Sequence, residues 1–150
     1  AHKGGGGAAV YDLGSLKELV ERGGFTCAIA KGDRLFTSTL RGIRPLLDLI
    51  ESGEDFSGGI AADKIVGRAA ALLYARLGIA EVYAGVLGEG GLAVLREHNI
   101  AAQFGTLAER IINRAGTDIC PMERASADIS NPNEAFFALK KRADELAAGK

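Results

Sequence analysis

The longest apolar segment of the chain runs from Gly58 to Gly78 and is the centre of the predicted fold. Residues 69–75 form an unbroken apolar run, while the charged residues of the segment lie toward its ends. A surface helix keeps one polar face, so this pattern predicts a helix that is buried on nearly every side. We expect Asp63 to be the N-cap of this central helix and Gly78 to end it.

The other hydrophobic patterns predict helices and strands that alternate along the chain. Ser15 and Glu18 form a capping box, which predicts a short helix over 16–22. Gly32 and Asp33 connect two β-rich runs in the manner of a tight hairpin. The hairpin strands are expected over 25–31 and 34–40, further strands over 80–87 and 100–104, and helices over 45–53, 90–98 and 106–114 and from Pro121 and Pro132 onward.

This order of elements predicts an α/β fold. A strand, a helix and a second strand over 80–104 form the unit that builds parallel pairing, and the hairpin adds antiparallel strands. We therefore expect a three-layer α/β/α domain with a mixed sheet of four to five strands. Residues 14–150 form this single domain, and residues 1–13, with four consecutive glycines, are expected to be a flexible tail.

Composition and charge argue against several classes of protein. The chain has 150 residues, with 18 basic and 19 acidic side chains, so the basic surface that nucleic-acid binding needs is not expected. We find no signal-peptide pattern and no apolar run long enough to span a membrane, and we expect a cytoplasmic protein. The two cysteines, Cys27 and Cys120, are too few for a disulfide scaffold.

Three short motifs resemble a known family. They are Asp63-Lys64-x-x-Gly67-Arg68, Asn113-Arg114 and Cys120-Pro121-x-Glu123, in this order. Together they resemble the prokaryotic domain-of-unknown-function family 1893. The resemblance covers the chain from about Ser15 to the last helix, and it implies a cytidine-deaminase-like fold without an assigned activity.

The same comparison predicts that zinc-dependent deamination is absent. Zinc deaminases place His or Cys with Glu at one helix start and Pro-Cys-x-x-Cys at the next. The corresponding positions here hold Asp63-Lys64 and the glycine-rich segment 88–91. The few His and Cys residues are scattered along the chain, so we expect no metal site and no cofactor.

The charged start of the predicted central helix is the leading candidate site. Lys64 and Arg68 would share one helical face at the end where free backbone N–H groups attract an anion. Asp63 would cap the helix or bind a ligand hydroxyl or amine. In the alternative interpretation Asp63 only caps the helix, and the two cations pair with carboxylates such as Glu89 or Glu123.

A second group of candidates comes from the resemblance, which implies that Asn113, Arg114, Cys120 and Glu123 lie near the central helix. Cys120 precedes a proline-started helix, where a helix dipole and nearby arginines lower a thiol pKa. It is therefore the candidate catalytic residue, with a buried structural cysteine as the alternative. Glu123 could instead cap its own helix. Cys27 is expected in the core.

These candidates lead to three hypotheses. In the first, a non-zinc deaminase-like domain binds a small anionic ligand, nucleotides included, through Asp63, Lys64, Arg68, Asn113, Arg114 and Glu123. In the second, the domain is a structural or regulatory homo-oligomer, such as a homodimer, that has no catalytic role. In the third, Cys120 serves a thiol-dependent enzyme.

Overall fold

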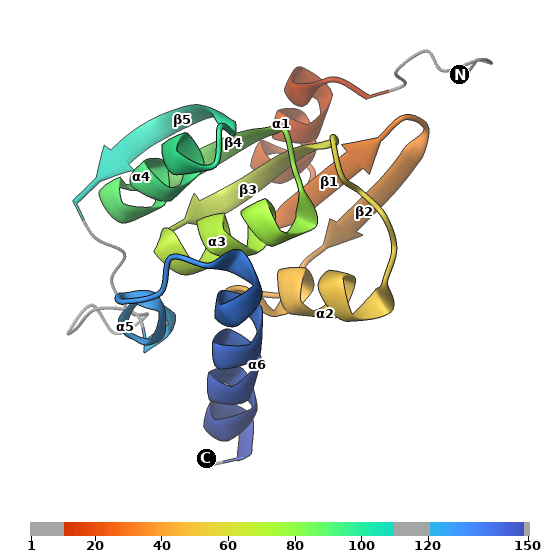
Figure 1. Ribbon diagram of the computed structural model, residues 1–150. Helices are drawn as coiled ribbons and strands as arrows, with labels where there is room; N and C mark the ends of the chain where they lie inside the picture. Colours follow the sequence, from red (N-terminus) through yellow and green to blue (C-terminus); the bar gives the residue numbers. More distant parts are fainter. Residues whose placement is uncertain (1–10, 110–120, 149–150) are drawn as a thin grey trace.

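The computed structural model, which describes residues 11–109 and 121–148, contains a five-stranded mixed sheet with helices on both faces (Figure 1). The strands are β1 (Cys27–Lys31), β2 (Arg34–Ser38), β3 (Ile60–Val66), β4 (Glu81–Gly88) and β5 (Ala101–Ala108). The helices are α1 (Leu13–Glu21), α2 (Arg44–Ser52), α3 (Arg68–Leu77), α4 (Glu89–Glu97), α5 (Pro121–Ser126) and α6 (Pro132–Ala148). This arrangement confirms the predicted α/β class.

The strand order is β2-β1-β3-β4-β5. β1 pairs antiparallel with both β2 and β3, whereas β3, β4 and β5 are parallel. Gly32 has a φ of 62° in the turn between β1 and β2, a conformation that glycine adopts without a steric penalty. The helices α3 and α4 connect the parallel strands, so both helices begin at the carboxyl edge of this part of the sheet.

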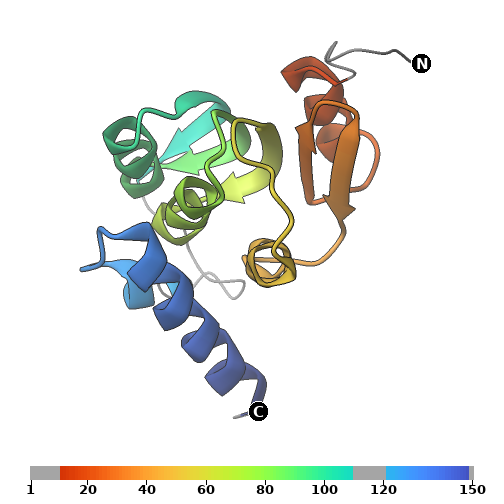
Figure 2. The same cartoon turned by 45° about the vertical axis from the view of Figure 1, so that its right-hand side comes forward.

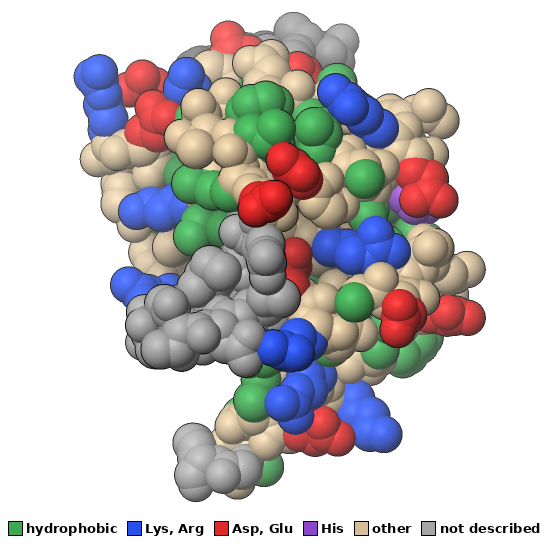
Figure 3. Space-filling view, turned by 90° about the vertical axis from the view of Figure 1, so that its left-hand side faces the viewer, with side chains coloured by type: hydrophobic (Ala, Val, Ile, Leu, Met, Phe, Trp, Pro, Cys, Tyr) green, Lys and Arg blue, Asp and Glu red, His purple; other side chains and the backbone are tan. Residues whose placement is uncertain are grey.

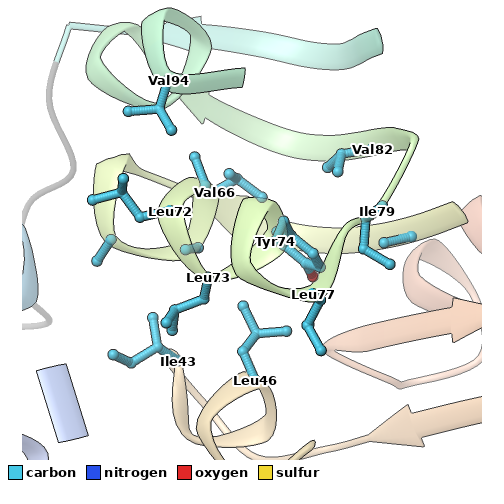
Figure 4. Packing of buried hydrophobic residues seen from close by; sticks show 14 of the residues in the cluster. Ile43, Leu46, Val66, Leu72, Leu73, Tyr74, Leu77, Ile79, Val82 and Val94 are labelled. Carbon is cyan, nitrogen blue, oxygen red and sulfur yellow. The ribbon is translucent and has the colours of Figure 1, made fainter. Parts of the chain in front are cut away.

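Each face of the sheet has its own hydrophobic core. On one face α1 buries Leu16 and Val20 against a small cluster of sheet residues that includes Tyr83. On the opposite face α2, α3, α4 and α6 enclose the larger core (Figure 2). Figure 4 shows side chains of α2, α3 and α4 meeting in this core, with Tyr74 among them. The predicted burial of the central helix is confirmed for residues 69–74.

The predicted start of the central helix, with Asp63 as its N-cap, is wrong. Residues 60–66 form strand β3, Gly67 is the N-cap residue, and the helix begins at Arg68. Asp63 is therefore inside a strand and does not cap a helix. A strand that is covered on both faces needs no polar alternation, so its apolar residues look like the beginning of a buried helix. The predicted end at Gly78, with a φ of 76°, is confirmed.

Other boundaries also differ. The first helix begins at Leu13, earlier than predicted, because Asp12 and Ser15 form the capping box. β5 continues to Ala108, so the predicted helix start at Thr106 is wrong. The hairpin, the strand after Gly78 and the helices after Ile43, Gly88 and Asn131 are confirmed within a few residues. Among the helices of the described residues, none has the length and apolar character needed to cross a membrane.

Candidate functional site

The starts of α3 and α4 lie side by side beyond the carboxyl ends of β3 and β4. A Cβ atom added to Gly91, in the first turn of α4, would lie 2.9 Å from the carbonyl oxygen of Gly67, so the two backbones pack closely. Gly90 lies beside the Cβ atom of Arg68, at 3.6 Å from an added Cβ. Open α/β sheets bind ligands at this edge, which makes the α3 start the candidate functional site.

A carboxylate of the chain itself occupies the start of α3. Oε1 of Glu123 accepts a hydrogen bond from the backbone N–H of Arg68 at 2.9 Å, and Oε2 accepts one from Ala69 at 3.0 Å. The missing side chain of Gly67 leaves room for this group, because an added Cβ would lie 2.6 Å from the carboxyl atoms. The first N–H groups of a helix attract anions, and Glu123 shows where an anion fits.

The side chain of Arg68 attaches the segment after α5 to the same site. Nε donates to the carbonyl oxygen of Ser126 at 2.9 Å, and a terminal nitrogen donates to the carbonyl oxygen of Ile129. Within the described ranges the guanidinium forms no ion pair with a carboxylate. Its positive charge therefore adds to the attraction for an anion at the helix start.

Asp63 lies elsewhere, in the core between β3, β1 and α3. It is 8% exposed, and its Oδ2 accepts a hydrogen bond from the hydroxyl group of Tyr74 at 2.7 Å. The Tyr74 oxygen is also 3.4 Å from Sγ of Cys27, which is the partner of Asp63 in the sheet register. Burial raises the pKa of Asp63 to about 7, although hydrogen bonds from Tyr74 and from the backbone of Ile65 and Lys64 oppose this shift.

Lys64 is exposed on β3, where its backbone N–H donates to the carbonyl of Thr26 at 3.0 Å. The predicted shared helical face of Lys64 and Arg68 is wrong, because only Arg68 is in the helix. The structure thus brings Arg68 and Glu123 together, and it places Asp63 and Lys64 outside their hydrogen-bonded contact. Asn113, Arg114 and Cys120 lie outside the described residues.

Sequence reasoning missed two residues of this region. Tyr74 was one member of an apolar run, yet a buried tyrosine hydroxyl usually needs a hydrogen-bond partner, and this need was the available signal. Gly67 was part of a motif, but its close approach to Glu123 joins segments that are more than 50 residues apart. No local pattern reports such a contact.

The surface around the site carries charges of both signs. Figure 3, seen from the side of α4 and α5, shows Lys and Arg side chains interspersed with Asp and Glu. Within the part of the chain that the structure describes, no three His, Cys, Asp or Glu side chains gather as they would around a metal ion. Burial strongly raises the pKa of Cys27, so its thiol is not activated.

Comparisons with known proteins agree on one family. The family model described as "Domain of unknown function (DUF1893)" matches residues 15–142. A DUF1893 family protein from Thermotoga maritima has a similar crystal structure, with a TM-score of 0.80 and 20% sequence identity over 92% of this chain and 95% of that chain. No curated protein matches the chain.

A second solved structure is more distant. It is a diaminohydroxyphosphoribosylaminopyrimidine deaminase/5-amino-6-(5-phosphoribosylamino)uracil reductase from Thermotoga maritima. Its TM-score is 0.43 at 17% identity, and the match covers 62% of this chain and 35% of that chain. Similarity at this level does not determine a function.

Proposed function

This chain belongs to the DUF1893 family of domains of unknown function, and we propose that it binds a small anionic ligand at the start of α3. The observation that supports the proposal is the position of the Glu123 carboxylate on the backbone N–H groups of Arg68 and Ala69. Because the sequence lacks the zinc-ligand pattern, the proposed role excludes classical zinc-dependent deamination.

The ligand would take the place of the Glu123 carboxylate. Two anions cannot share two N–H groups without strong repulsion, so ligand binding requires the Glu123 side chain to move away. Glu123 is then an internal competitor that lowers the affinity of the site for free anions. Arg68 would contribute its charge, and Asn113, Arg114 and Lys64 remain proposed ligand contacts.

Thermal unfolding of matched variants tests this competition. Glu123→Gln keeps the shape of the side chain and removes its charge, while Glu134→Gln removes a charge from the first turn of α6 and serves as the control. Inorganic phosphate, acetate, citrate and AMP are the probes. We expect Glu123→Gln to bind at least one probe about tenfold more tightly than the wild type and the Glu134→Gln control do.

The ligand also stabilises the folded state by mass action, by about 2.7 kcal/mol at a hundred times its dissociation constant. Arg68→Ala in the Glu123→Gln background should abolish this gain, whereas Lys64→Ala shows whether Lys64 takes part. If none of the four probes raises the unfolding temperature of Glu123→Gln, the proposed function is wrong.

The outer strand β5 favours a second candidate function, a homo-oligomer. β5 is eight residues long, carries no charged residue and lies at the edge of the sheet. Phe104 and Leu107 on this strand are each 42% exposed. Natural edge strands usually carry charges or bulges that prevent pairing, so an uncharged edge favours association. Sedimentation velocity of the wild type and Phe104→Lys would show a dimer that this substitution dissociates.

The third hypothesis, a thiol-dependent enzyme, stays a prediction because Cys120 lies outside the described residues. It requires a thiolate that reacts with iodoacetamide near neutral pH much faster than a free thiol does. Reaction at the ordinary rate would remove Cys120 as a catalytic candidate.

A further inference from the structure

Asp63 is a carboxylic acid inside the main core, at the contact between α3 and the sheet. Its side chain joins two elements, because Oδ2 accepts from the Tyr74 hydroxyl group of α3 while Oδ1 accepts from the backbone N–H of Ile65 at 3.3 Å. Tyr74 is fully buried, and Figure 4 shows apolar side chains around it. Among the described residues, Tyr74 of α3 is thus the only side chain that forms a hydrogen bond with Asp63.

The surroundings contain no charge that would stabilise an ionised carboxylate. From β1 the facing titratable group is Cys27, from α3 it is Tyr74, and the partner of Asp63 on β4 is Ala84. The two arginines of α3 contact the C-terminal segment, and the charged residues of α2 are at least partly exposed. Within the described residues, no cation pairs with Asp63, so ionisation puts an uncompensated charge in the core.

We propose that Asp63 is a proton-controlled lock between α3 and the sheet. The neutral acid keeps α3 packed against β1 and β3, and loss of its proton to water loosens this contact. The lock does not depend on the proposed anion binding, because Asp63 lies outside the hydrogen-bonded contact between Glu123 and α3.

The physical cause is the cost of a buried charge. In the packed state ionisation is opposed by desolvation, whereas in a locally opened state water can solvate the carboxylate. Proton release therefore accompanies opening, and opening becomes easier as the pH rises. In agreement with this cause, burial raises the pKa of Asp63 to about 7, and the hydrogen bonds to its carboxylate only partly oppose the rise.

Carbon-13 NMR of the wild-type protein tests the first half of the proposal. The Asp63 carboxyl carbon is expected to titrate with a midpoint near pH 7, and Tyr74→Phe is expected to raise that midpoint, because the Tyr74 hydrogen bond lowers the pKa. An aspartate whose carboxylate is well solvated or well stabilised by hydrogen bonds would titrate near or below its ordinary value. A midpoint below pH 5 in the wild type would overturn the proposal even if no variant folds.

Amide hydrogen exchange tests the second half. After correction for the intrinsic exchange rate, the opening constant of the α3 amides is expected to rise about tenfold from pH 5 to pH 6 and less than twofold from pH 7 to pH 8. Asp63→Asn should remove this dependence. Asp48→Asn, which removes an exposed carboxylate from α2, should leave it unchanged. An opening constant that is independent of pH in the wild type would overturn the proposal.

Discussion

At the scale of single residues, the Glu123 carboxylate occupies the space that a side chain at position 67 would fill. The carboxylate lies directly over the Cα position of Gly67, where any other residue would place its Cβ atom. The φ of Gly67 is −104°, which other residues adopt easily. Space, and not backbone conformation, therefore explains the glycine at this position.

Gly67→Ala should expel the carboxylate from the helix start. The new Cβ would lie 2.6 Å from the Glu123 carboxyl atoms. The two hydrogen bonds from the backbone N–H groups to the carboxylate are therefore lost, and the unfolding free energy falls by about 1 to 3 kcal/mol. Urea denaturation measures this change. Gly90→Ala is the control, because its Cβ would meet only the Arg68 Cβ at 3.6 Å, and alanine favours a helix. Equal stability of both variants would contradict the assigned contact.

Sequence patterns identified several residues of the site but did not predict which contacts they make. Arg68 and Glu123 were both candidates, and the alternative interpretation even considered that they pair. The structure shows a different bond, from the Glu123 carboxylate to backbone N–H groups. Spacing along the chain cannot distinguish side-chain from backbone partners across more than 50 residues. Asp63 was assigned to a helix cap because Asp is common there, and its burial became visible only with β3 in place.

At the scale of elements, α3 anchors the C-terminal segment through two arginines. Arg68 in the first turn donates to the carbonyls of Ser126 and Ile129, and Arg76 in the last turn donates to the Asn133 side chain at 2.8 Å. The contacts differ in burial, because Arg68 is partly buried and Arg76 is exposed. A hydrogen bond from a charged donor is worth more when its acceptor is shielded from water.

Arg68→Ala should destabilise the domain much more than Arg76→Ala. Removing Arg68 leaves two carbonyls without their donors, which costs about 2 kcal/mol, whereas the exposed Arg76 contact is worth within about 0.5 kcal/mol. Chemical denaturation of both variants measures the difference. Similar losses would mean that Arg68 does not anchor the segment after α5.

Element type was predictable where local signals were strong. The Gly32-Asp33 turn, the glycine after α2 and Gly78 were assigned correctly, because each turn or helix end requires a residue that tolerates its backbone conformation. The boundary between β3 and α3 was missed for the opposite reason. Gly67, the N-cap residue, has no side chain that could cap α3, and the cap is supplied by the Glu123 carboxylate from another element.

At the scale of the molecule, the mixed character of the sheet followed from the order of elements, but its central strand did not. The strand that joins the antiparallel hairpin to the parallel strands is β3, which the sequence assigned to a helix. β3 also carries the buried carboxyl group, so the same error hid both the middle of the sheet and its titratable residue. The pKa of the Asp63 carboxyl group in the folded protein depends on its buried position in β3.

The global stability of the protein should fall between pH 5 and pH 8 because of Asp63. Burial raises its pKa from 3.8 to about 7, so the folded state binds this proton more tightly than the unfolded state does. The sign follows from linkage: this contribution is fully present below about pH 4, is lost as the pH rises through about 7, and is then constant. At 1.36 kcal/mol per pKa unit, the loss from pH 5 to pH 8 is roughly 2 to 3 kcal/mol.

Asp63→Asn isolates this contribution, because the amide has nearly the same shape and does not titrate. Other groups also change stability with pH, so the informative quantity is the difference in unfolding free energy between the variant and the wild type. This difference should shift in favour of the variant by roughly 2 to 3 kcal/mol from pH 5 to pH 8 in urea denaturation. A difference that stays constant with pH would mean that Asp63 titrates alike in the folded and unfolded chains, and that burial at the α3 contact does not control its proton.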